Sequence, residues 1–407
     1  MAKERFPALK HRDFRLMWIG LLISNIGTQM QFAAINWHIF ILTGSAISLG
    51  LIGLSRFVPI TIFSLIGGAV ADTHNRKRIL FITQTVLTIL SFILAITTIT
   101  HLVNPLIIYA ITALTSVAIA FDAPPRQAIV PSLVKGKHVS SAMSLNVTIW
   151  YSGMIIGPAL SGFIIKFFGV GGIYLINSVS FLAVISALLL MKTSGDIEGE
   201  PSKVSLAAIW EGLVFVKSKT IIWSTMILDF LSTFFSSATA LLPIFTEKIL
   251  HVGPIGFGFL YAAPAIGAVL TGFFTARSGT IKNQGKVLIL SILLYGAATI
   301  IFGLSKFFIL SFFALFLVGA GDSISSVIRN TIRQLETPDY IRGRMTSINM
   351  IFFMGGPQLG EFEAGILAAV IGGPLSVVVG GVGTIAAVGT MAVLVPVLRN
   401  YSGKKEN

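Results

Sequence analysis

Long runs without a charged residue constrain this chain more than any other feature. Aspartate, glutamate, lysine and arginine are all absent from the stretches 16–55, 79–121, 138–165, 167–191, 249–276, 287–305 and 364–398. A membrane-spanning helix needs about 20 apolar residues, so each stretch can cross a bilayer. Only 11% of the residues are charged and 54% are hydrophobic, whereas a soluble domain has about 25% charged residues. The sequence therefore predicts an all-α membrane protein and excludes a soluble enzyme.

Turns between and within these runs divide the chain into twelve predicted transmembrane helices. The stretch 79–121 has 43 residues, too many for one crossing, and His101 to Pro105 supply a turn in its middle. The predicted helices cover 16–40, 47–71, 78–100, 105–124, 139–167, 172–191, 219–248, 254–277, 286–305, 307–332, 344–371 and 374–397.

The longest polar stretch, 192–203, lies near the midpoint of the chain and predicts a seam between two halves. We expect a six-helix bundle over 1–191 and a second six-helix bundle with a short tail over 219–407. The residues between them, 192–218, are expected to form a cytoplasmic linker with a short amphipathic helix over 204–216.

Lysine and arginine residues predict the orientation of the helices. With both termini in the cytoplasm, 25 of the 29 basic residues fall in predicted inner segments, as the positive-inside rule requires. The net charge of +13 then reflects the placement of basic residues on the cytoplasmic side of the membrane, and it gives no support to a nucleic-acid partner.

The sequence has no signature of an enzyme or of a bound cofactor. Cysteine is absent, which excludes disulfides, thiolate metal sites and a cysteine nucleophile. No G-x-x-x-x-G-K-[ST] or H-E-x-x-H motif occurs. We therefore expect no enzymatic activity, no cofactor, no metal and no direct use of ATP.

A glycine, an acid and basic residues lie between the second and third predicted helices, at Gly68, Asp72 and Arg76. The glycine is expected to let two helices approach closely. This segment resembles the loop signature of the major facilitator superfamily. Two positions depart from that signature: Thr73 replaces a basic residue, and Asn75 replaces the turn glycine. A solvated basic loop is the alternative interpretation.

The fifth predicted helix contains small residues four apart and a proline, at Gly153, Gly157, Pro158 and Gly162. Such spacing permits tight helix contact, and a proline inside a helix bends it. The pattern resembles the antiporter signature of the same superfamily, which is typical of exporters. The alternative is a close-packed helix without that function. A second glycine–proline pair, Gly356-Pro357, lies about 200 residues further on and suggests a duplicated half.

Further short sequence segments extend the resemblance over nearly the whole chain, among them Phe121 to Arg126, Arg342 to Met345 and Gly360 to Gly365. They resemble the enterobactin-exporter and transmembrane-secretion-effector branch, which is related to macrolide and drug efflux proteins. The resemblance implies gating charge pairs between helices at their cytoplasmic ends. The residues concerned are Asp72, Arg76, Asp122, Arg126, Asp322 and Arg333.

Ionisable residues inside predicted helices are the candidates for transport chemistry, because charge is costly within a bilayer. Asp229, Glu361 and Glu363 could each carry a proton, and Glu361 and Glu363 cannot share a helix face. Arg56 is equally compatible with a structural and a functional role. The hydroxyl residues after Asp229 could line a water path, or they could join helices.

Arg56 and four further residues could contact a substrate in a central cavity. Gln29 and Asn36 are seven apart on one helix face and could form hydrogen bonds with cargo. Trp150 and Phe234 could stack on an aromatic substrate, although aromatic residues also occupy membrane interfaces and helix cores.

The sequence thus predicts a monomeric secondary transporter in a bacterial inner membrane. It would export a small amphipathic molecule, such as a siderophore or drug, by proton antiport and alternating access. One alternative is an importer or uniporter of a metabolite, which would not need the antiporter-type fifth helix. Another is a non-transporting membrane receptor, whose activity would survive neutralisation of Asp229, Glu361 and Glu363.

Overall fold

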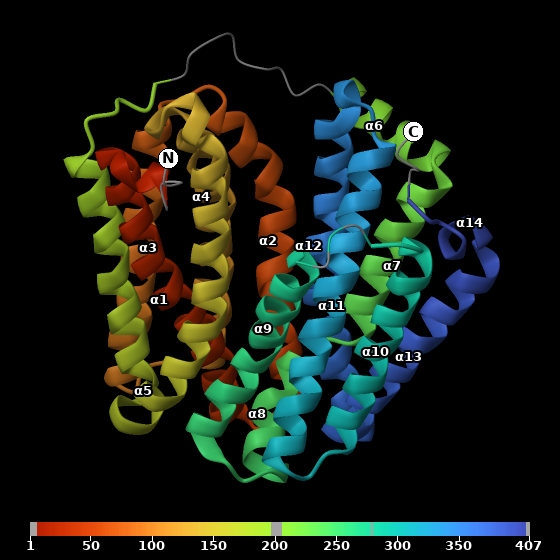
Figure 1. Cartoon of the computed structure of the whole chain (residues 1–407). Helices are drawn as coiled ribbons and strands as arrows, with labels where there is room; N and C mark the ends of the chain where they lie inside the picture. The colour runs from red at the N-terminus through yellow and green to blue at the C-terminus, as the bar shows by residue number, and fades with distance from the viewer. Residues whose placement is uncertain (1–5, 197–205, 278, 280, 404–407) are drawn as a thin grey trace. The chain divides into compact units, whose positions relative to one another are not determined.

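The structure is a computed structural model that describes residues 6–196, 206–277, 279 and 281–403 (Figure 1). Over these ranges the chain is helical, with short connections and no strand. Residues 197–205, which belong to the predicted linker, lie outside the described residues. By chain contacts, residues 1–43 and 58–203 form one compact unit, called unit 1 here, and residues 44–57 and 204–407 form another, called unit 2.

Unit 1 contains long helices that cover its described residues almost completely. They are α1 (Arg12–Thr43), the second half of α2 (Ala46–Ala71), α3 (Arg76–Ile99), α4 (Pro105–Leu133) and α5 (Val139–Leu190). Helix α5 packs against α1 and α3, and α3 packs against α4. A core of buried apolar side chains, including Phe14, Leu21, Leu80, Val130 and Val184, holds these helices together.

Unit 2 contains the first half of α2 and the helices of the second half of the chain. They are α6 (Leu206–Ser218), α7 (Thr220–Phe235), α8 (Leu242–Ile244), α9 (Gly253–Arg277), α10 (Gln284–Leu304), α11 (Phe308–Glu336), α12 (Arg342–Ile371), α13 (Gly373–Leu394) and α14 (Pro396–Arg399). Helix α7 packs against α12, α9 against α11, and α10 against α11 and α13. Ile222, Met226, Ile328 and Val388 lie in the apolar core of this unit.

Two predicted helices meet in α5, and one predicted helix is broken. Gly169 has a φ of 72°, a left-handed conformation that glycine tolerates, and it divides α5 into two arms. The predicted helix 219–248 ends at Phe235 and continues as a 3₁₀ turn over Ala238–Leu241, the short α8, and a π turn over Phe245–Ile249. The prediction of one continuous helix there is wrong, because Ser237 has a ψ of 51°, outside the helical region, and Pro243 lies in the first turn of α8, where its missing N–H is tolerated.

Nine helical segments in the described part of the chain are long and apolar enough to cross a membrane. One of them, Gly136–Leu190, contains both arms of α5. Helices α1 and α12 are not among the nine, because polar side chains such as Gln29, Asn36 and Glu361 lower their hydropathy. The prediction of an all-helical membrane protein is confirmed.

Candidate functional site

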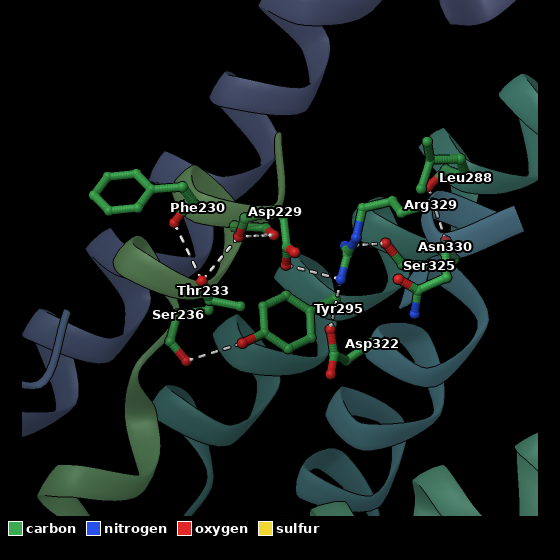
Figure 2. A network of polar contacts seen from close by, with 12 residues as sticks. Asp229, Phe230, Thr233, Ser236, Leu288, Tyr295, Asp322, Ser325, Arg329 and Asn330 are labelled. Carbon is green, nitrogen blue, oxygen red and sulfur yellow. Dashed lines mark hydrogen bonds and ion pairs between the residues drawn. The ribbon is translucent and has the colours of Figure 1, made fainter. Parts of the chain in front are cut away.

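A buried cluster of charges joins α7 to α11 inside unit 2 (Figure 2). The Arg329 guanidinium lies 2.8 Å from an oxygen of Asp229 and 3.4 Å from an oxygen of Asp322, so two carboxylates share it. Arg333 lies 3.9 Å from the other oxygen of Asp229. Arg329 and Asp229 are sealed, with side chains 1% and 2% exposed, whereas the Asp322 side chain is 47% exposed. The cluster is therefore buried at Asp229 and exposed at Asp322.

Helical periodicity accounts for the residues that α11 contributes. Asp322, Ser325, Arg329 and Arg333 recur at intervals of three or four, which places them on one face of the helix. Ser325 accepts a hydrogen bond from Arg329, and Arg333 donates to Asn330 and Asn349. The sequence singled out Asp229, Asp322 and Arg333 but missed Arg329 as a site residue. The spacing of seven between Asp322 and Arg329 was the available signal.

A second, looser ion pair joins the first half of α2 to α12 within unit 2. Nη1 of Arg56 lies 4.0 Å from Oε2 of Glu361, and both side chains are nearly buried, at 11% and 13% exposed. That Oε2 is buried and accepts no hydrogen bond from the described residues. Gly53 lies against Glu361, where a β-carbon would come within 2.9 Å of the Glu361 Cβ. Glu363 is half-buried.

Two of the hydroxyl residues that follow Asp229, Ser236 and Ser237, join helices, whereas Ser232 and Thr233 donate to carbonyls of their own helix. Ser236 and Thr384 share a hydrogen bond of 2.7 Å, and Ser237 donates to the carbonyl of Pro357 at 3.0 Å. Tyr295 from α10 donates to the carbonyl of Ser236 at 3.4 Å, as Figure 2 shows. Each of these hydrogen bonds joins α7 or the turn after it to α12, α13 or α10. The structure therefore supports the interpretation in which these hydroxyl residues join helices.

The substrate-cavity candidates in unit 1 are neutral. Gln31 of α1 accepts hydrogen bonds from Ser91 and Asn177, at 2.9 and 2.8 Å, which forms a buried amide network. Gln29 and Asn36 are buried on the same helix. Trp150 is 56% exposed on α5. In unit 2, Phe234 stacks on Phe230 with ring centroids 5.7 Å apart.

The glycines of the fifth predicted helix contact α1. A β-carbon at Gly157 would lie 2.7 Å from the Gln29 Cβ and 2.9 Å from the Ile26 carbonyl. A β-carbon at Gly153 would overlap the side chain of Asn25, and Pro158 and Gly162 are buried. In unit 2, β-carbons at Gly356 and Gly360 would overlap Thr233 and the Phe234 carbonyl of α7. Both units thus contain a helix pair held close by glycines.

The remaining motif residues lie around the first turn of α3 and the last part of α4. Asp122 accepts hydrogen bonds from Thr83 and Gln84, each at 2.8 Å, and pairs with Arg126 one turn along its own helix. Arg76 donates to the carbonyl of Ala128 at 2.9 Å. Asp72 lies directly after α2.

The expected close approach at Gly68 is wrong, because a β-carbon there would meet nothing within 4 Å. The neighbouring Gly67 makes the contact instead, since a β-carbon at that position would overlap the Ala120 carbonyl of α4. Among the described residues, no group of three or more histidine, aspartate or glutamate side chains gathers into a metal site.

This all-helical architecture, with two glycine-tightened helix pairs and buried ion pairs in apolar helices, defines a multi-span membrane protein. The sequence profile described as transmembrane secretion effector, within the major facilitator superfamily, matches residues 4–404. The chain belongs to this family, which confirms the resemblance found in the sequence and makes the protein a transporter rather than an enzyme.

Relatives and solved structures agree with this assignment. The staphyloferrin A transporter of Staphylococcus aureus is 27% identical over 360 residues, 88% of each chain. The enterobactin exporter of Escherichia coli is 24% identical over 397 residues, 96% of this chain and 94% of the relative. A bacterial homologue of the human lysosomal transporter Spinster has a similar fold, with a TM-score of 0.74 at 14% identity, covering 97% and 99% of the two chains. A bacterial homologue of the iron transporter ferroportin has a TM-score of 0.68 at 14% identity, covering 93% and 98%.

Proposed function

We propose that this protein is a secondary active transporter that exports a small amphipathic molecule of siderophore chemistry in exchange for protons. The observation that carries the proposal is similarity along almost the whole chain to two proteins named for siderophores, staphyloferrin A and enterobactin. The antiporter-type glycines at Gly153 and Gly157 support export, because they hold α5 tightly on α1.

We propose twelve crossings in two six-helix bundles, with both termini in the cytoplasm of a bacterial inner membrane. The distribution of 25 of the 29 basic residues supports the orientation. The nine candidate spans of the described residues become twelve crossings when the two arms of α5 are counted separately and α1 and α12 are added. Alternating access of a central site would then move cargo across the bilayer.

Glu361 is the carboxylate that best fits the role of proton carrier. Asp229 is held by Arg329 at 2.8 Å and by Arg333 at 3.9 Å, which stabilises its charge. Glu361 is nearly as well buried, but its Arg56 partner lies 4.0 Å away, and its Oε2 accepts no hydrogen bond from the described residues. A buried carboxylate with weak compensation loses less when it takes up a proton.

Transport by purified protein in vesicles tests the proposal. Efflux of enterobactin, used as the probe, would be driven by an imposed pH gradient. We expect Glu361→Gln to abolish gradient-driven efflux, whereas exchange of cargo without a gradient continues. Glu363→Gln, two residues away on a different face of the same helix, is the matched control.

Two results would contradict the proposal. Unchanged gradient-driven efflux after separate neutralisation of Asp229, Glu361 and Glu363 would exclude coupling through any of them. Uptake in place of efflux, or no movement of either enterobactin or staphyloferrin A by the unaltered protein, would exclude siderophore export.

A further inference from the structure

Two apolar grooves run along α3 in unit 1, and one arginine lines both. The larger, of about 700 Å³, is lined by α2, α3 and α4, and its apolar wall includes Ile79, Ile82, Val86, Leu90, Leu114 and Phe121. The smaller, of about 230 Å³, is lined by Phe81 of α3 and by Leu188 and Leu189 of α5. Arg78 lines each of them.

The larger groove has the length of one membrane leaflet. From Ile79 to Leu90 along α3, at 1.5 Å per residue, the apolar wall extends about 16 Å. The hydrocarbon core of a bilayer is about 30 Å thick, so the groove matches one layer of acyl chains. Its wall is not fully closed, because Ile82 and Leu114 are each 53% exposed.

At the polar end of this groove lies a basic side chain, Arg78, that forms no hydrogen bond or ion pair with the described residues. Arg76 donates to the carbonyl of Ala128, and Lys77 donates to the carbonyl of Met191. Among the described residues the exposed side chain of Arg78 has no hydrogen-bond or ion-pair partner, and only its backbone N–H is bonded, to Asn75. His74 and Asn75 line the same end.

Helical geometry places Arg78 between the two grooves. With 3.6 residues per turn, Phe81 lies roughly opposite Ile79 around α3, and Arg78 lies between them. A guanidinium at this point can bind the phosphate of a lipid through paired hydrogen bonds, while one acyl chain enters the groove on each side.

We propose that unit 1 binds an anionic diacyl phospholipid at Arg78, with its phosphate on the guanidinium and its acyl chains in the two grooves beside α3. In the proposed orientation this lipid belongs to the cytoplasmic leaflet, where basic pockets between helices bind anionic headgroups. The site lies outside the candidate carboxylates of unit 2, so it extends the proposed function and does not depend on the identity of the cargo.

Native mass spectrometry of the purified full chain, with phosphatidylglycerol or phosphatidylcholine added, tests the site. We expect a retained phosphatidylglycerol adduct and a much weaker phosphatidylcholine adduct. Arg78→Gln should weaken phosphatidylglycerol binding about tenfold, because it removes a charge-assisted contact. Arg12→Gln is the matched control, since Arg12 is also exposed at the start of a helix and lines neither groove.

A second pair of variants tests the acyl chains. Val86→Trp fills the larger groove from a position that is 39% exposed, and Val179→Trp adds the same bulk at an exposed position of α5 outside both grooves. Only Val86→Trp should reduce the adduct. Equal retention of the two lipids, undiminished binding by Arg78→Gln, or equal binding of headgroup-only glycerol phosphate would overturn the proposal.

Discussion

The two units contain the same helix contact but bury different polar groups beside it. In unit 1, Gly157 of α5 lies against Ile26 and Gln29 of α1. In unit 2, Gly356 of α12 lies against Phe230 and Thr233 of α7. Aligned on these contacts, Asn25 of unit 1 occupies the position that Asp229 occupies in unit 2.

The difference at this position explains why two arginines lie beside the helix contact in unit 2. Asn25 is neutral, and its amide donates to the carbonyl of Ile149 at 2.8 Å, so the backbone satisfies it. Asp229 is a buried carboxylate, which would cost several kcal/mol without a counter-ion. Unit 2 supplies Arg329 and Arg333 for that purpose. At this position unit 1 has a neutral amide, whereas unit 2 has a charged cluster that a proton or an anionic cargo can disturb.

Removal of Arg329 should lower the free energy of unfolding more than any other change considered for the two units. Arg329→Met leaves Asp229 without its 2.8 Å partner, and we expect a loss of about 3–5 kcal/mol in the free energy of unfolding. Asn177→Ala, which removes one donor from the amide network of unit 1, should cost about 1–3 kcal/mol. Chemical denaturation in detergent, followed by tryptophan fluorescence, measures both. The double variant Asp229→Asn with Arg329→Met should recover part of the loss, and equal costs for the two single variants would contradict the comparison.

The glycine contacts should differ in tolerance even though they look alike. A β-carbon at Gly360 would meet the backbone carbonyl of Phe234, which cannot move aside, so Gly360→Ala should cost about 1–3 kcal/mol by overpacking. A β-carbon at Gly153 would meet the amide of Asn25, a side chain that can rotate. Gly153→Ala should therefore cost only about 1 kcal/mol, the value of one hydrogen bond. Thermal unfolding midpoints compare the two, and a larger loss at Gly153 would contradict this account.

The smallest expected effect concerns the segments that follow the last helix of each unit. Burial raises the pKa of Asp13, but hydrogen bonds from Thr193 and from the Lys192 backbone outweigh it and hold the pKa below the usual 3.8. In unit 2, burial and the nearby Glu336 carboxylate raise the pKa of Tyr401, whose hydroxyl donates to Glu336 at 2.8 Å.

These opposite shifts give opposite pH dependences. A lowered carboxyl pKa adds stability above pH 3.8 that is lost as acid protonates Asp13. A raised phenol pKa adds stability that is present below pH 10 and lost only as strong base ionises Tyr401. The protection factors of the Lys192 and Thr193 amides, which correct for the pH dependence of intrinsic exchange, should therefore fall below about pH 4, while those of the Tyr401 segment stay unchanged. Asp13→Asn should lower the protection factors of Lys192 and Thr193 already at neutral pH.

Much of the fold was predictable because it depends on local composition. Charge-free runs located the membrane helices, and the spacing of Gly153 and Gly157 predicted a tight contact. Hydropathy does not predict the break after Phe235, because Ser236 and Ser237 lie between apolar residues such as Phe234 and Leu241 and do not end the hydrophobic run. The loop signature indicates Gly68 whereas Gly67 makes the contact, because a pattern of residue types cannot tell which of two adjacent glycines faces a neighbouring helix.

The candidate site was only partly predictable, for a different reason. Asp229 and Glu361 could each be identified as a candidate for transport chemistry, because a charged side chain in an apolar membrane helix is energetically costly. Their partners lie far away in sequence: Arg329 is 100 residues from Asp229, and Arg56 more than 300 from Glu361. Only the packing of α7 on α11 and of α2 on α12 brings these charges together, and no local pattern encodes that.

Proton flux driven by cargo tests the central claim most directly, namely that the charged groups of unit 2 couple protons to transport. A pH dye inside proteoliposomes would report protons moved when enterobactin is added. We expect flux with the unaltered protein and with Asp122→Asn of unit 1, and none with Glu361→Gln. The account is contradicted if Glu361→Gln, Glu363→Gln and Asp229→Asn all keep the full flux, or if Asp122→Asn alone abolishes it.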